Sequence, residues 1–297
     1  MKENRDDRNF IPILSVFDLI ASTSASVFFV LESIYFVVFP SESLCIGLFF
    51  VMTGSSSTSG LLLLLIAVQR YLKICKPLGN QMNESKRKIA LMAVIVISIL
   101  WSCPVLVLAG IKQVEGVVHT INVTGWSCYP TSGKYPTIEG VYYSLFFFLV
   151  AANIFIVTLL YIPIGIQIYK HTRKTQTANA NIASAPSDST SESKPVDGPS
   201  LVAFTRKKAY RASQINFNMI FMTIMMFYLI SYVPTCIFIL IGKLSDHDFW
   251  YNLSTEEMNI YFTLDRFYVI NHVVNPIIYC YFDFKFRKDF ISLFRCS

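Results

Sequence analysis

Charge is scarce in this sequence. Only 15% of the 297 residues are charged, whereas 54% are hydrophobic, and this is more apolar side chain than one soluble core of this size normally buries. The composition therefore favours a membrane protein. The net charge of +6 comes from short basic clusters between apolar runs. Such clusters favour lipid headgroups and cytosolic proteins as neighbours and argue against nucleic acid.

The patterns that enzymes and metal centres need are also missing. The seven cysteines form no CxxC pair and no Cys/His cluster at metal-ligand spacing. No nucleophile stands beside a base, and no phosphate-binding loop is present. We therefore expect neither an enzyme nor a metal centre. No cleavable signal peptide is visible either, because MKENRDDRN runs into an apolar stretch too long for a signal core.

What the sequence does contain is long apolar runs. A helix needs roughly 20 mostly apolar residues to cross a bilayer. Six runs qualify, at about residues 10–39, 43–72, 89–110, 140–169, 215–242 and 259–282. An amphipathic tail helix is expected over 283–295, and a disordered loop over 175–200, which is rich in Ser, Thr, Ala and Pro. The predicted fold class is an all-α membrane protein.

Basic residues predict the orientation of these spans. Most of the 25 Lys and Arg residues lie in the N-terminal piece, the second and fourth connections and the tail. The positive-inside rule then places both termini in the cytosol. Two glycosylation sequons, at Asn122 and Asn252, fall in the loops that this orientation puts outside, so we expect glycans there.

Polar side chains at membrane depth are costly, and each marks a candidate site. Asp18 is the clearest, with a merely structural, hydrogen-bonded carboxylate as the alternative. One face of the second span carries a series of residues at helical spacing, namely Cys45, Met52, Ser59, Ile66 and Arg70.

The last span carries a second polar stripe, made by Asn271, Asn275 and Tyr279, and Pro276 favours a kink there. Together with Asp18 and Ser59, the two amides supply oxygens that suit a small hard cation or a water cluster. The alternative is that these residues only join helices by hydrogen bonds.

Several short motifs resemble those of the rhodopsin-like (class A) G-protein-coupled receptors. In family order they are SVFDL, QRY at 69–71, Trp101, SYVP, NPIIY and FKFRKDF. The resemblance covers nearly the whole chain and implies a heptahelical receptor bundle. Six of the seven transmembrane helices have a counterpart, and the first helix does not. A truncated or mispredicted gene product is the simplest explanation, with a six-span variant as the alternative.

The resemblance also implies roles for individual residues. It implies a disulfide between Cys45 and Cys128, and an allosteric sodium pocket, the one cofactor site expected, made by Asp18, Ser59, Asn271 and Asn275. The implied activation switch and G-protein contact consist of Gln69, Arg70, Tyr71, Pro77, Leu78, Tyr161, Tyr232, Pro234, Pro276 and Tyr279. Within this set, Arg70 is released on activation and meets Tyr161 and Tyr279.

One departure from the family pattern concerns the switch. Gln69 stands where an acid usually pairs with the arginine, and Gln214 faces it with another amide. A neutral amide holds a guanidinium more weakly than a carboxylate does. We therefore expect a less restrained inactive state and measurable basal signalling.

A second departure concerns the relay between ligand and switch. Tyr232 replaces the usual tryptophan and Asn153 the usual proline, while Gly60 and Tyr228 depart from the usual hydrophobic triad. Transmission must therefore use a different packing arrangement.

The ligand is constrained mainly by exclusion. Met52 stands where amine receptors have an aspartate, and the last span has no lysine for a retinal Schiff base. Acidic and aromatic residues near the outside, including Asp265 and Arg266, favour a peptide with basic groups. A solvated charged rim without ligand contact is the alternative. The candidate ligand residues are Met52, Asp265 and Arg266.

The sequence thus predicts a multi-pass receptor of the plasma membrane that passes an extracellular, peptide-like signal to a heterotrimeric G protein. A truncated, non-signalling receptor variant and an ion channel or transporter are the alternatives. Cys296 is a candidate for palmitoylation, with a bare thiol as the alternative. Receptor kinases and arrestin are expected to act on the serine-rich loop, at Ser184, Ser187, Ser189, Thr190, Ser191 and Ser193.

Overall fold

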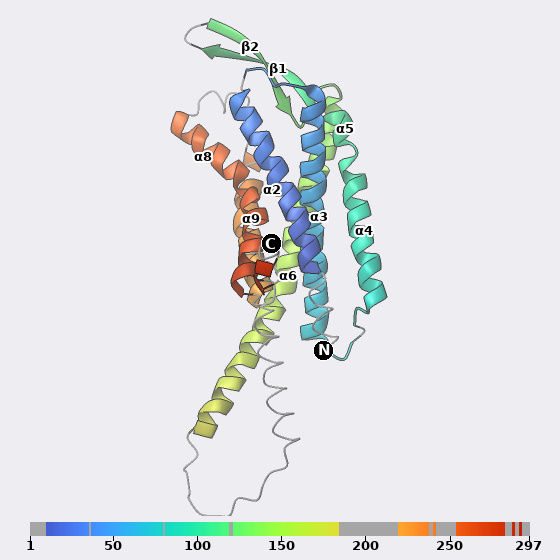
Figure 1. Ribbon diagram of the computed structural model, residues 1–297, viewed down its shortest axis with the longest axis vertical. Coiled ribbons are helices and arrows are strands. Elements are labelled where there is room, and N and C mark those ends of the chain that lie inside the picture. Colours follow the sequence, from blue (N-terminus) through green and yellow to red (C-terminus); the bar gives the residue numbers. More distant parts are fainter. Residues whose placement is uncertain are drawn as a thin grey trace, which may run out of the picture.

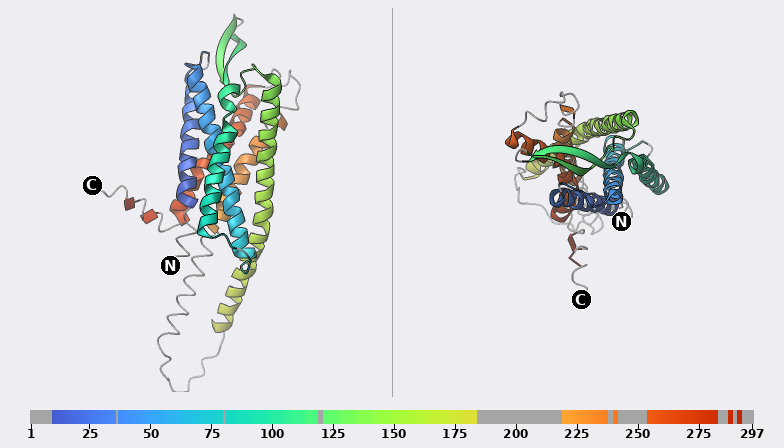
Figure 2. Two further views of the ribbon diagram at one scale, coloured as in Figure 1. Left: turned by 90° about the vertical axis from the view of Figure 1, so that its right-hand side faces the viewer. Right: turned by 90° about the horizontal axis from the view of Figure 1, so that it is seen from above.

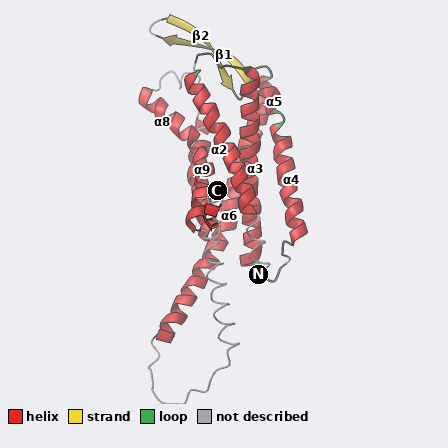
Figure 3. Cartoon of the chain, viewed as in Figure 1, coloured by secondary structure: helices red, strands yellow, loops and turns green. Residues whose placement is uncertain are grey.

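The computed structural model is a bundle of long helices with a two-stranded hairpin at one end (Figures 1 and 3). It describes residues 10–35, 37–79, 81–118, 121–183, 219–237, 240–241, 254–282, 287–288 and 291–292. Gln214, Asn252, Cys296 and the six Ser and Thr residues expected to be phosphorylated lie outside this part of the chain.

Five helices in the described part are long and apolar enough to cross a membrane. Each coincides with one of the first five predicted spans. They are α2 (Phe10–Ile34), α3 (Glu42–Cys75), α4 (Glu84–Ser102) continued by α5 (Val105–Leu108), α6 (Pro136–Ala183) and the helix Met219–Ile237. The described chain is thus a multi-pass membrane protein.

The sixth predicted span, residues 259–282, is a broken helix. It is formed by α8 (Thr255–Asp265), whose first turn precedes the span, a single 3-10 turn η2 (Arg266–Tyr268) and α9 (Val269–Phe282). The hydroxyl of Thr235 donates to the carbonyl of Leu264 at 3.1 Å, and a side chain inserted into the carbonyl ladder commonly bends a helix. The break therefore precedes Pro276, which lies inside α9 and where the sequence predicted the kink.

α3 is the central helix. It contacts α2, α4, α5 and α6, and α2 also contacts α9, so α2 and α3 connect both sides of the bundle (Figure 2). The N-terminus of α4 is capped by Asn83, whose side chain accepts from the backbone N–H of Lys86 at 3.0 Å.

The surface of the helices is apolar, unlike that of a soluble protein. Large apolar side chains such as Leu19, Val30 and Leu100 are exposed there, whereas the charged residues Asp18 and Arg70 are buried in a largely apolar core. A lipid solvent stabilises an apolar exterior, and charged groups at membrane depth face the interior of the bundle.

The hairpin was not part of the helical prediction. Strands β1 (Gly110–Val118) and β2 (Ile121–Tyr129) pair antiparallel, so the third span ends at Leu108 and the chain then turns to β structure. β-branched residues are frequent in both strands, which favours extended backbone. Seen from above, the hairpin lies across the ends of the helices (Figure 2). We call this the outer end of the bundle, and the opposite end the inner end.

The segment after α2 attaches to the hairpin. The Trp126 N–H donates to the Val37 carbonyl at 2.7 Å, and the Phe39 N–H donates to the Trp126 carbonyl at 2.8 Å. At Gly125, a Cβ atom would lie 2.6 Å from the Val37 carbonyl oxygen, closer than real Cβ contacts allow. Glycine is therefore needed there because two backbones approach each other closely.

One boundary prediction at the inner end needs correction. α6 continues to Ala183, so residues 175–183 of the expected disordered loop are helical. Unbroken helical hydrogen bonding can extend beyond a membrane wherever the sequence contains no proline or glycine, and none occurs in 175–183. Of the expected tail helix 283–295, residues 287–288 and 291–292 are described, and they are helical.

Candidate functional site

A hydrogen-bonded polar network surrounds Asp18 in the middle of the bundle. Asp18 is fully buried on α2. Ser59 Oγ, from α3, donates to Asp18 Oδ1 at 2.6 Å, and Asn275 Nδ2, from α9, donates to Asp18 Oδ2 at 2.8 Å. The structure therefore brings together three of the four residues that the sequence grouped.

Asn271, the fourth, is buried on α9. Neither of its side-chain polar atoms has a hydrogen-bond partner in the described part of the chain, and Asn275 Oδ1 has none there either. Unpaired amide atoms of this kind are sites where a buried water binds.

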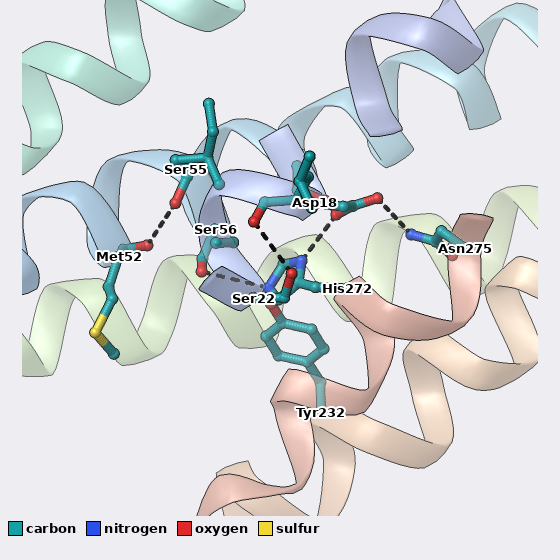
Figure 4. Close-up of polar contacts among 12 residues, drawn as sticks. Asp18, Ser22, Met52, Ser55, Ser56, Tyr232, His272 and Asn275 are labelled. Carbon is teal, nitrogen blue, oxygen red and sulfur yellow. Dashed lines mark hydrogen bonds and ion pairs between the residues drawn. The ribbon is translucent and has the colours of Figure 1, made fainter. Parts of the chain in front are cut away.

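His272 is a member of this network that the sequence reasoning missed. Its Nδ1 lies 2.8 Å from Asp18 Oδ1, and its Nε2 lies 3.3 Å from Ser56 Oγ and 3.4 Å from the Tyr232 hydroxyl. In Figure 4 the imidazole stands between Asp18 and Tyr232. The signal was present, because an imidazole within the NHVVN stretch is as unusual at membrane depth as the two asparagines.

A second polar contact joins three helices. The Tyr228 hydroxyl donates to Asn153 Oδ1 at 2.9 Å, and Asn153 Nδ2 donates to the Gly60 carbonyl at 3.4 Å. The ring of Tyr228 lies 4.8 Å from the ring of Tyr232, one turn further along the same helix. The positions that depart from the family pattern are thus in mutual contact, by hydrogen bonds and ring packing.

Arg70 lies at the inner end of the bundle, buried beside aromatic side chains. Its guanidinium carbon stands 5.0 Å from the centre of the Phe221 ring, a cation–π arrangement. Phe221, Tyr161 and Tyr279 belong to one buried cluster. Gln69 is also buried, and its Oε1 has no hydrogen-bond partner among the described residues.

The turn after α3 presents a large apolar side chain. Leu78 is 101% exposed. Gln81 Nε2 donates to the carbonyl of Lys76 at 2.8 Å and to that of Leu72 at 3.1 Å, so it caps the end of α3 and supports the turn. Tyr71 is partly buried against the same cluster as Tyr161.

The candidate ligand residues occupy two neighbouring sites. Met52 is buried in a cluster with Phe28, and Phe29 packs against that cluster. Arg266 lies 4.5 Å from the centre of the Phe29 ring, and its Nη2 donates to Glu32 Oε2 at 2.8 Å. Arg266 thus joins the broken last span to α2 near the outer end.

The disulfide implied by the resemblance is confirmed. Cys45 on α3 is bonded to Cys128 on β2, with 5.7 Å between their Cα atoms. The bond fastens the hairpin to the central helix. Asn122 lies in β2 opposite Val117, and Thr124, which completes its sequon, is exposed.

Comparison with known proteins agrees with this geometry. No curated protein matches the chain significantly. The model of one family, described as 7 transmembrane receptor (rhodopsin family), matches residues 2–279. The match spans every helix described above apart from the last residues of α9 and the tail. The chain therefore belongs to the rhodopsin family of seven-transmembrane receptors.

Proposed function

We propose that this receptor passes the signal of an extracellular, peptide-like ligand to a cytosolic heterotrimeric G protein at the plasma membrane. One observation carries the proposal. At the inner end, Arg70 is buried over the ring of Phe221, which clusters with Tyr161 and Tyr279, while Leu78 is fully exposed in the turn after α3. A buried charge is suited to a switch, because a rearrangement that exposes it creates a charged surface for a partner.

Transmission to this switch is proposed to run through hydrogen-bonded tyrosines. Tyr232 contacts His272 in the Asp18 network, and Tyr228 contacts Asn153. Both tyrosines lie on the helix Met219–Ile237. The same helix carries Phe221, whose ring faces the guanidinium of Arg70. A rotation of this one helix therefore changes all three contacts together.

A peptide ligand is supported by the outer end. Glu32 is partly exposed there and is paired with Arg266, and a basic group on a ligand competes with Arg266 for that carboxylate. The hairpin, fixed by its disulfide, lies beside this pair and offers backbone for an extended ligand. Glycans on Asn122 and Asn252, palmitoylation of Cys296 and control by kinases and arrestin complete the proposal.

The test is coupling in cells. The full chain is expressed with individual G-protein subtypes and exposed to a peptide library, and a second messenger is measured. Arg70→Ala is expected to abolish the response at equal surface expression. Lys88→Ala removes an exposed charge from the i,i+4 pair with Glu84, and is expected to leave the response unchanged.

Other results contradict the proposal in distinguishable ways. Ion flux or uptake without any G protein favours a channel or transporter. Normal surface expression without coupling to any subtype favours a non-signalling receptor variant.

A further inference from the structure

The carboxylate of Asp18 already receives three protein donors. Oδ1 accepts from Ser59 Oγ and lies 2.8 Å from His272 Nδ1, while Oδ2 accepts from Asn275 Nδ2. Each carboxylate oxygen offers about two lone-pair sites. Both sites of Oδ1 are therefore used by side chains of this protein.

The contact with His272 determines which nitrogen carries hydrogen. When the carboxylate is ionised it only accepts hydrogen bonds, and Nδ1 then carries the hydrogen across this 2.8 Å contact. The neutral imidazole and its cation both satisfy this requirement. The positive end of an N–H dipole then points at Oδ1 in either form and repels a cation that approaches the same oxygen.

The ring cannot easily turn away. Asp18 and His272 are 0% and 1% exposed, and Nε2 of the ring is held by Ser56 and Tyr232 on its other side (Figure 4). Contacts at both nitrogens fix the orientation of the imidazole between α2, α3, α9 and the helix Met219–Ile237. Close packing of this kind leaves a ring few alternative rotamers.

The unpaired atoms nearby suit a water molecule. Asn271 Oδ1 and Asn275 Oδ1 are unpaired acceptors in the described part of the chain, and the Asn271 amide is also an unpaired donor. A water molecule satisfies donors and acceptors together. Because both oxygens of Asp18 already contact side chains of this protein, the residues present do not fit a sodium ion at Asp18.

We infer that the imidazole of His272 replaces the allosteric sodium ion at Asp18, so that sodium does not regulate this receptor. His272 determines the specificity of the pocket. Its ring also connects Asp18 to Tyr232, because one ring nitrogen contacts each of them. The inference concerns ion binding and holds whether or not the receptor couples to a G protein.

The experiment compares sodium with potassium. The full chain is purified in lipid nanodiscs, and its thermal unfolding is followed in NaCl and in KCl at equal ionic strength. The unfolding temperature of the unmodified receptor is expected to be the same in both salts. His272→Ser puts a small hydroxyl in place of the imidazole. The unfolding temperature of this variant is expected to be higher in NaCl than in KCl, by on the order of 3 °C. Adding Asp18→Asn to that variant should remove this difference.

Two results overturn the inference. One is a sodium-specific rise in the unmodified receptor. The other is a folded His272→Ser variant that stays insensitive to sodium, because His272 is then not what excludes the ion.

Should the variant fail to fold, ²³Na NMR of the unmodified receptor decides alone. Line broadening that Asp18→Asn removes contradicts the inference, and equal line widths for both proteins support it.

Discussion

The two ends of this receptor are held together by different kinds of contact. At the outer end, a disulfide joins Cys45 to Cys128, and an ion pair joins Glu32 to Arg266. Backbone hydrogen bonds attach the segment after α2 to the hairpin. These links are covalent, ionic or part of a strand ladder, and they resist small rotations of the helices.

At the inner end the contacts that can be described are of another kind. Gln69 stands where the family usually has an acid, Arg70 lies over the ring of Phe221, and Tyr161 and Tyr279 pack in the same buried cluster as Phe221. Packing contacts rearrange more readily than a disulfide does. The difference favours conformational change at the inner end, where we propose that a G protein binds.

The largest expected loss of stability comes from removing the disulfide at the outer end. Cys45→Ser removes a cross-link between residues 83 positions apart, and the chain-entropy argument gives a loss of about 4.5 kcal/mol of stability. Thermal unfolding of the purified receptor measures it. Cys103→Ser alters an exposed thiol outside the disulfide and should change little. Equal unfolding temperatures for the two variants would mean that the disulfide does not fasten the outer end.

A smaller change tests the attachment of the hairpin. Gly125→Ala places a Cβ 2.6 Å from the Val37 carbonyl oxygen, and relieving that overlap is expected to cost about 1–3 kcal/mol of stability. Gly140→Ala is the control, because nothing lies within 4 Å of the Cβ that it adds. Thermal unfolding distinguishes them, and an unchanged Gly125→Ala variant would show that the hairpin adjusts freely.

Adding an ionic contact at the inner end should make that end more resistant to rearrangement. Gln69→Glu places a carboxylate beside Arg70, which stabilises the inactive state, so ligand-independent signalling is expected to fall on the order of tenfold. Gln69→Met, of similar size and without charge, should not lower it. Basal second-messenger level at matched surface expression is the measurement. A complete absence of basal signalling in the unmodified receptor would contradict the premise.

The smallest effect is a pH dependence at the start of α8. Ser254 and Glu257 form a capping box, in which the Ser254 backbone N–H donates to the Glu257 carboxylate at 2.8 Å. This bond, followed by the Ser254 side-chain bond, lowers the pKa of Glu257 below its ordinary value of 4.5. The ionised carboxylate therefore stabilises α8 above pH 4.5, and the contribution is lost as the pH falls through the lowered pKa.

Glu257→Gln tests this sign. The variant should unfold at a slightly lower temperature than the unmodified receptor at neutral pH, and the difference should vanish in acid. Glu256→Gln, in the same turn but outside the capping box, should show no such trend. A difference that grows in acid would contradict the assignment.

Much of the fold could be predicted because hydrophobic length is a local property. The first five spans coincide with helices of the bundle, since each apolar run alone is long enough to cross a bilayer. The Cys45–Cys128 pairing came from family resemblance, since the spacing of seven cysteines alone allows many pairings. The grouping of Asp18, Ser59 and Asn275 followed from the cost of polar groups in lipid.

What could not be predicted depends on contacts between distant segments. The 3-10 break in the last span involves Thr235 on another helix, and the partner of Arg266 is Glu32 on α2. Helical periodicity gives the face on which a residue lies, not the rotation of one helix against the next. His272 was missed for the same reason, because only the packed bundle shows that its ring reaches Asp18.

α6 makes the approach of a cytosolic partner asymmetric. Its 48 residues give a length of about 70 Å at 1.5 Å per residue, whereas the hydrocarbon core of a bilayer is about 30 Å thick. Its inner end extends beyond the ends of the other helices (Figure 1). A protein that docks against Leu78 therefore meets the end of α3 on one side and the projecting part of α6 on the other. This geometry limits the directions from which docking can occur.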